Sequence, residues 1–159
     1  MLPKASIDQR GTNTGFIAAT FDGFTALFSP ESIVAIEQRS NLTDHRDTYA
    51  MYRSGRVNAR VFALSRALRP IAKTDRPYFI VARHQAGTFG LACDELQVIN
   101  SSRVSFRLIP KSLKCGNSPI EAFAQFGKKI VFQCSLDAIA ALLPLEDAEA
   151  HAHEQSHMA

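Results

Sequence analysis

An internal repeat constrains the fold of this chain more than any other feature. The segment from Phe16, "FIAATFDGFTALFSPESIVAIEQ", parallels the segment from Phe79, "FIVARHQAGTFGLACDELQVINS". A second pair, "GRVNARVFALSRAL" and "GKKIVFQCSLDAIAAL", gives in each copy a Gly, an apolar strand and an amphipathic turn. Solenoids are built from shorter repeats than these. Two copies predict two small units packed face to face, because each alone would bury too little apolar surface to be secure.

Short strands dominate both copies. "FIAATF" and "FTALFS" flank Asp22-Gly23, a dipeptide that favours a type I′ hairpin turn because both central residues need positive φ. "ESIVAIEQ" predicts a third strand, and the alternation in "GRVNARVFAL" predicts a fourth, followed by a helical turn in "SRALRP". The second copy predicts strands in "YFIVARH", "TFGLACD", "LQVINS", "EAFAQF" and "KIVFQCS", a long loop over residues 102–120, and a short helix in "LDAIAALL".

Composition narrows the class of protein. A chain of 159 residues with 46% apolar residues fits one domain with a buried core. The net charge of +3 is mild and no Lys/Arg-rich run is present, so no nucleic-acid partner is predicted. Three widely spaced cysteines argue against a disulfide framework and fit a reducing cytosol.

The ends of the chain carry no targeting signal that we recognise. The N-terminal "MLPKASIDQRGTNTG" has no apolar core of the kind found in a signal peptide, and no apolar run approaches the roughly 18 residues of a membrane helix. We therefore expect a cytoplasmic protein without direct membrane insertion. Residues 1–14 and 146–159 are polar, with little to bury, and are predicted to be disordered tails around one domain at 15–145.

The sequence Cys93-Asp94-Glu95 raises the question of a reactive site, because a thiol stands beside two carboxylates. A nucleophilic or metal-binding role would need a lowered thiol pKa and a base or further ligands nearby. Strand alternation instead places Phe89, Leu91 and Cys93 on one face, which predicts that Cys93 packs as a small apolar residue. The two carboxylates are then expected where the strand turns.

Other candidate sites are weaker. Asp44-His45-Arg46-Asp47 matches no metal-binding spacing and is expected to be a solvated loop, and His84 is expected to be a surface turn residue. The tail residues His151, His153 and His157 predict only adventitious metal binding. No nucleophile-elbow, P-loop, dinucleotide-binding or zinc-protease motif is present, so the chain is predicted to be no enzyme, with no catalytic residue, metal or cofactor.

A run of arginines follows one strand and its turns. It comprises Arg53, Arg56, Arg60 and Arg66. These residues fit a solvated strand face, and they also fit a docking surface for an acidic partner, since the guanidinium group offers several donors in a rigid geometry.

The twice-repeated plan of hairpin, third strand, loop, apolar strand and short helix resembles the CheW-like domain family of bacterial chemosensory arrays. The best-matching segments are "FTALFSPESIVAIE", "FGLACDELQVI" and "FGKKIVFQCSLDAIAAL", and the resemblance covers roughly residues 15–143. It implies a mostly β fold of two intertwined, SH3-like, five-stranded barrels with short helices, which we place at about 15–76 and 77–145. A hydrophobic core between the barrels is also implied.

The resemblance also implies a non-catalytic adaptor that couples a methyl-accepting chemoreceptor to the regulatory domain of a CheA-type histidine kinase. Arg53, in "YRSGRV", is the candidate for the partner-contacting Arg of the family's "N-L-R-G" turn, although Ser54 here separates it from Gly55. Arg56 and Arg60 extend the same partner surface, and Leu96 and Val98 are possible receptor contacts. A β-barrel module that binds a small ligand or nucleic acid remains the alternative, because such barrels serve many functions. An enzyme using Cys93 is the third.

Overall fold

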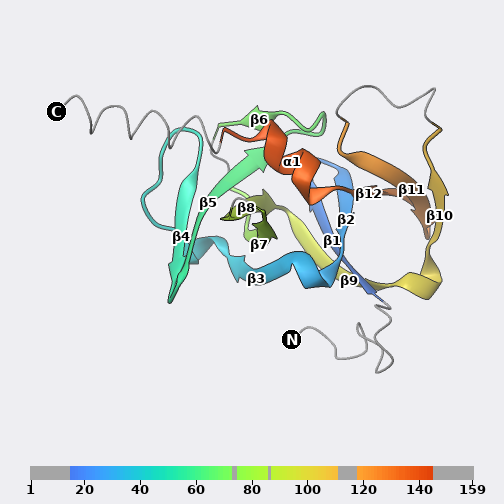
Figure 1. Ribbon diagram of the computed structural model, residues 1–159, viewed down its shortest axis with the longest axis horizontal. Helices are drawn as coiled ribbons and strands as arrows, with labels where there is room; N and C mark the ends of the chain where they lie inside the picture. The colour runs from blue at the N-terminus through green and yellow to red at the C-terminus, as the bar shows by residue number, and fades with distance from the viewer. Residues whose placement is uncertain (1–14, 73–74, 86, 111–117, 145–159) are drawn as a thin grey trace.

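Two curled sheets make up most of the molecule (Figure 1). The structure is a computed structural model that describes residues 15–72, 75–85, 87–110 and 118–144. Sheet one has the strand order β10-β11-β12-β2-β1-β9, and sheet two has the order β3-β7-β8-β5-β4 with β6 paired to β5. The strands of sheet one are β1 (Gly15–Phe21), β2 (Phe24–Phe28), β9 (Glu95–Asn100), β10 (Ser105–Leu108), β11 (Ile120–Phe126) and β12 (Lys129–Cys134). Those of sheet two are β3 (Ile33–Gln38), β4 (Ala50–Ser54), β5 (Val57–Leu64), β6 (Pro70–Ile71), β7 (Tyr78–His84) and β8 (Gly87–Cys93).

Each sheet combines a hairpin from one repeat with the later strands of the other. The hairpin β1–β2 of the first repeat pairs with β9 and β12 of the second. Reciprocally, the hairpin β7–β8 of the second repeat pairs with β3 and β5 of the first. The two halves of the chain therefore exchange strands, and neither sheet can form without the other half.

The first hairpin has the turn that its sequence predicts. Asp22 and Gly23 have φ of 52° and 80°, and Phe21 pairs with Phe24 across the turn. Positive φ at both central positions is the signature of the type I′ turn, which matches the right-handed twist of the strands it joins. Asp and Gly tolerate this conformation better than other residues do.

Strands β1, β2, β7 and β8 are buried on both faces over most of their length, because three apolar clusters lie between and inside the sheets. The central cluster combines residues of both sheets, among them Ile17 and Phe28 from sheet one and Ile80 and Phe89 from sheet two. A second cluster, inside the curl of sheet one, holds Ala18, Leu27, Ile99, Ala124 and Val131. A third, inside the curl of sheet two, holds Tyr52, Ala59, Val61, Phe79 and Val81. Period-2 alternation thus sends successive residues of a strand into different cores.

The last segment of each repeat crosses to the opposite sheet. Helix α1 (Leu136–Leu142) follows β12 of sheet one but packs against β7 of sheet two. Ser135 caps this helix by accepting a hydrogen bond from the Ala138 N–H at 3.2 Å. The segment after β5 of sheet two turns to sheet one, where the Arg66 N–H donates to Asp22 Oδ2 at 3.1 Å.

The mostly β fold and the core between the sheets are confirmed, and several details differ from the sequence-based expectations. Within the described residues each sheet has six strands, not five. The expected boundary between residues 76 and 77 falls inside sheet two, because the sheets exchange strands. The expected loop over 102–120 contains β10, and "SRALRP" forms a turn with Leu68 at φ 61° instead of a helical turn. The predicted tails at 1–14 and 146–159 lie outside the described residues.

Candidate partner-binding groove and arginine face

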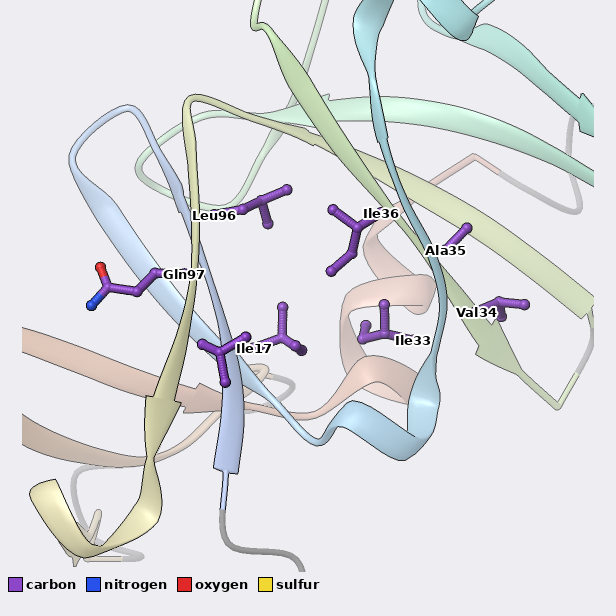
Figure 2. A pocket seen from close by; sticks show the side chains of 8 residues that line it. Ile17, Ile33, Val34, Ala35, Ile36, Leu96 and Gln97 are labelled. Atoms are coloured by element: carbon purple, nitrogen blue, oxygen red, sulfur yellow. The ribbon is translucent and has the colours of Figure 1, made fainter. Parts of the chain in front are cut away.

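An apolar groove of about 450 Å³ lies between the two sheets (Figure 2). Its walls are β3 and β9, each of which is the terminal strand of its sheet. Figure 2 shows Ile33 and Ile36 from β3 facing Leu96 from β9, with Ile17 of β1 at the base. The remaining lining residues are Val34, Ala35, Gln97 and Val98.

The two walls are related by the internal repeat. Ile33 pairs with Ala82 and Ile36 with Ile80 on one side, while Leu96 pairs with Ala19 and Val98 with Ile17 on the other. Because the segment from Phe16 parallels the segment from Phe79, Ala19 corresponds to Ala82 and Ile17 to Ile80. The four apolar side chains Ile33, Ile36, Leu96 and Val98 therefore form two equivalent pairs, which we call the groove quartet.

A β-bulge in β3 makes this equivalence possible. The register with β7 shifts between Ile33 and Ala35. Two residues of β3 therefore lie between Ile33 and Ile36, whereas one residue of β9 lies between Leu96 and Val98. Ile33 and Ile36 consequently both pack against the central core, whereas Val34 and Ala35 pack against the core of sheet two. Without the bulge, alternation would turn one of the two isoleucines away from the groove.

The groove is better suited to binding an apolar surface of a partner protein than to binding a small polar molecule. Sites for small molecules combine an apolar lining with a few placed polar groups that fix the orientation of the ligand. Gln97 is the one polar side chain among the lining residues, and Figure 2 shows it pointing away from the quartet. All four quartet side chains are half-buried, so that each still has apolar surface to offer a partner.

The predicted arginines lie together at the β4–β5 hairpin. Arg53 and Arg56 are exposed, and Arg60 is half-buried with its guanidinium carbon 5.1 Å from the centre of the Tyr49 ring. Arg53 forms an ion pair with Asp44, and both side chains are about half exposed, so this contact contributes little to stability. We call Tyr49, Met51, Arg53, Arg56 and Arg60 the arginine face. Arg66, in the turn after β5, lies instead beside the β1–β2 turn.

Cys93 is confirmed as a packing residue. Its side chain is fully buried in the central core, and burial raises the pKa of the thiol to about 12. The thiol is thus neutral at physiological pH, which is the opposite of what a nucleophile needs. Asp94 joins two turns, since its backbone N–H donates to Thr20 O at 2.7 Å and its carboxylate accepts from the Asp22 N–H at 2.9 Å. The carboxylates thus mark a corner of the chain, as the alternation predicts.

His84 makes structural contacts. His84 was expected in a surface turn, but it is half-buried at the end of β7, with Nε2 3.5 Å from Asp137 Oδ1 and its ring edge-on to Phe89. Strand alternation did not reveal this because Asp137 lies on α1, which follows β12 of sheet one.

Among the described residues, no three His, Cys, Asp or Glu side chains are grouped as a metal site. No helix in that part of the chain has the length and apolar character to cross a membrane.

Sequence reasoning named one wall of the groove and missed the other. Leu96 and Val98 were predicted as contacts, and the structure places both on β9 facing β3. Ile17, Ile33 and Ile36 were not singled out. The internal repeat offers a signal for this wall, because Ile33 occupies the position in the first repeat that Leu96 occupies in the second. The local sequence pattern does not show, however, that β3 leaves its own hairpin and pairs with β7 of the other repeat.

Comparison with known proteins supports the fold. The scaffolding protein TtCheW from Thermoanaerobacter tengcongensis has a similar structure, with a TM-score of 0.56 over 79% of this chain and 91% of that chain. The two sequences are 12% identical over this match. No protein-family model matches the chain, and no curated protein matches it. The chain therefore has the CheW-like fold.

Proposed function

We propose that the protein is a non-catalytic scaffold of bacterial chemosensory signalling that couples a methyl-accepting chemoreceptor to a CheA-type histidine kinase. The observation that carries the proposal is the apolar groove between the two terminal strands, in a fold shared with a scaffolding protein. A scaffold needs exposed surfaces of complementary chemistry more than it needs reactive groups. The groove and the arginine face are two such surfaces, formed by different elements.

In this proposal the groove receives the receptor. The quartet supplies four apolar anchors, which is the pattern by which a few central side chains dominate the affinity of an interface. Because β3 belongs to sheet two and β9 to sheet one, a partner in the groove contacts both sheets at once. A change in the partner's shape therefore alters the position of one sheet relative to the other.

The arginine face supplies the kinase contact. Arg53 and Arg56 project from a hairpin, where an acidic partner surface has free access. Arg→Glu substitution at an exposed rim position mainly repels an acidic partner and costs the fold little. Arg53→Glu is therefore expected to weaken binding of the kinase regulatory domain about tenfold or more while leaving the melting temperature nearly unchanged. A large loss of stability would mean that Arg53 is structural.

The test is titration of the purified chain with each partner from the same organism, followed by circular dichroism to confirm folding. We expect saturable binding of the kinase regulatory domain at or below tens of micromolar. Leu96→Ser should weaken receptor binding, because a half-buried apolar anchor typically contributes about 1–2 kcal/mol. Leu108→Ser is the matched control, since Leu108 is 80% exposed on β10 at the far edge of sheet one. Absence of binding by the folded chain would refute the scaffold proposal.

A further inference from the structure

We propose that the chain forms a weak two-fold dimer in which β10 pairs antiparallel with β10 of a second copy. β10 (Ser105–Leu108) is a terminal strand of sheet one, so one of its edges pairs with β11 and the other pairs with no described strand. Figure 1 shows β10 at the right-hand end of sheet one. The pairing uses neither the groove nor the arginine face, so it does not rest on the proposed scaffold function.

The other three terminal strands each have a feature that opposes the addition of a strand. β3 carries a bulge, and β9 begins with the charged Glu95. β4 is bridged on its outer side by Thr43, whose N–H donates to Met51 O at 2.8 Å and whose carbonyl accepts from the Met51 N–H at 2.7 Å. Bulges, charges and cover are the usual protection of a strand edge. Within the described residues β10 has no bulge and no such bridge, so its protection comes from the charge of Arg107 and from its short length.

The alternation of side chains restricts how two copies of β10 can pair. Successive side chains of a strand point to opposite faces, so a continuous sheet requires the two-fold axis to pass through a residue and not between two residues. β10 therefore offers four axes, one at each of its residues. An axis at Leu108 brings Pro110 into the paired segment, although proline has no N–H to donate. An axis at Ser105 or Arg107 opposes two arginines, either Arg107 with Arg103 of the second copy or Arg107 with its own counterpart.

The remaining axis, at Phe106, gives compatible pairs along the whole strand. Arg107 then lies opposite Ser105 of the second copy, so that like charges, which destabilise a strand pair, no longer face each other. Leu108 lies opposite Val104 of the second copy, on the side of the sheet where Val104 and Phe106 pack against the core of sheet one. Leu108 is 80% exposed, the highest value among the large apolar side chains of the described residues. Its burial against Val104 is the apolar gain of the dimer.

The dimer is expected to be transient. A strand of four residues forms few hydrogen bonds, and interfaces below about 1,200 Å² are typical of weak association. We therefore expect a dissociation constant on the order of 0.1–1 mM. Copies held close together by a common partner reach effective concentrations of about 1 mM, at which such a contact is occupied for much of the time.

The experiment is sedimentation equilibrium of the purified full chain from about 10 µM to about 1 mM, which covers the expected range. Leu108→Lys should weaken dimerisation at least about tenfold, because a lysine on an edge strand opposes pairing and the substitution acts at both ends of the interface. Ser105→Glu should strengthen dimerisation about threefold or more, because it places a carboxylate opposite Arg107 at two symmetric positions. Ile130→Lys is the matched control, since Ile130 is 51% exposed on β12, two strands from β10. Circular dichroism confirms that each variant is folded.

A wild-type chain that stays monomeric at about 1 mM refutes the dimer. A dimer that Leu108→Lys leaves unchanged, or that Ile130→Lys weakens equally, uses another surface and also overturns the proposal. If Ser105→Glu fails to tighten a dimer that Leu108→Lys disrupts, the axis is not at Phe106 and the proposed pairing is wrong. Titrations with the receptor or the kinase domain at about 10 µM chain use the monomer, so Leu108→Ser remains a control there. Loss of partner binding therefore refutes the scaffold function without affecting the dimer, and the reverse also holds.

Discussion

Replacing Gly90 with Ala tests the strand exchange at its tightest point. Gly90 lies in β8 between β7 and β5, opposite Val81 on one side and Val61 on the other. A Cβ added at this position would lie 2.6 Å from Val61 Cγ2 and 3.1 Å from the Ile80 carbonyl oxygen. One of these neighbours is a stiff β-branched side chain and the other is backbone, so neither can move away easily. The seam where the two repeats join has no room for one methyl group.

The cost follows from overpacking. Inserting a methyl group into a packed core typically destabilises a protein by about 1–3 kcal/mol. For a domain of this size, each kcal/mol lowers the melting temperature by about 2–4 °C, so Gly90→Ala should lower it by about 2–12 °C. The measurement is chemical denaturation of the wild type and the variant, with thermal unfolding as a second readout.

A second substitution decides whether the cause is the contact with Val61. Val61→Ala removes the clashing methyl group, so the double variant Gly90→Ala/Val61→Ala should be more stable than the sum of the single effects predicts, by at least about 1 kcal/mol. Val131→Ala is the control partner, since Val131 is equally buried but belongs to the core of sheet one. A loss below about 0.5 kcal/mol for Gly90→Ala, or strict additivity with Val61→Ala, would refute the reasoning.

Four further predictions concern individual residues. The thiols of Cys93 and Cys134, whose pKa burial raises from 9.0 to about 12, should resist alkylation in the folded chain at pH 8, and mass spectrometry of digested peptides would detect contrary labelling. Because the pKa of both thiols is raised in the folded chain, the free energy of unfolding that the neutral thiols contribute is complete below pH 9 and falls as the pH rises toward 12. Alkaline denaturation would show this loss. Asp94→Ala should cost about 1 kcal/mol by removing the acceptor of the Asp22 N–H, while Asp94→Asn should cost less; equal losses would assign the effect elsewhere. Ser135→Ala should lower the free energy of unfolding by about 1 kcal/mol, because it removes the cap of α1. Ser135→Asp should keep the cap and the stability of the wild type, and urea denaturation measures both variants.

Local pattern was sufficient for most individual strands. The alternation in "YFIVARH" and "TFGLACD" predicts β7 and β8, and Asp22-Gly23 predicts the first turn, because these features depend on neighbours in sequence. β10 was missed because "SFRL" is short and three of its residues are exposed, which leaves little apolar period to detect. The side-chain pattern of residues 65–69 predicts a helical turn, and the positive φ of Leu68 that produces a different turn has no signature in that pattern.

The candidate site was half predictable for a related reason. Leu96 and Val98 were identified on one strand, and the opposite wall needs the knowledge that β3 leaves its own hairpin to pair with β7. This is a long-range choice between two hairpins with a similar apolar pattern. Repeat symmetry makes both pairings locally similar in chemistry, so only the packing of the whole chain distinguishes them.

Strand exchange also explains why the groove is where it is. The third strand of each repeat, β3 or β9, pairs with the hairpin of the other repeat and is the terminal strand of that sheet. Strand exchange therefore places β3 and β9 on opposite sides of the boundary between the two sheets. A terminal strand carries unpaired backbone groups on one side and is normally protected by bulges, charges or cover. Here β3 carries a bulge and β9 begins with Glu95, yet the groove quartet between them remains apolar. A surface that is protected against strand pairing while its side chains stay apolar is suited to recognising side chains, and that is the property a docking scaffold requires.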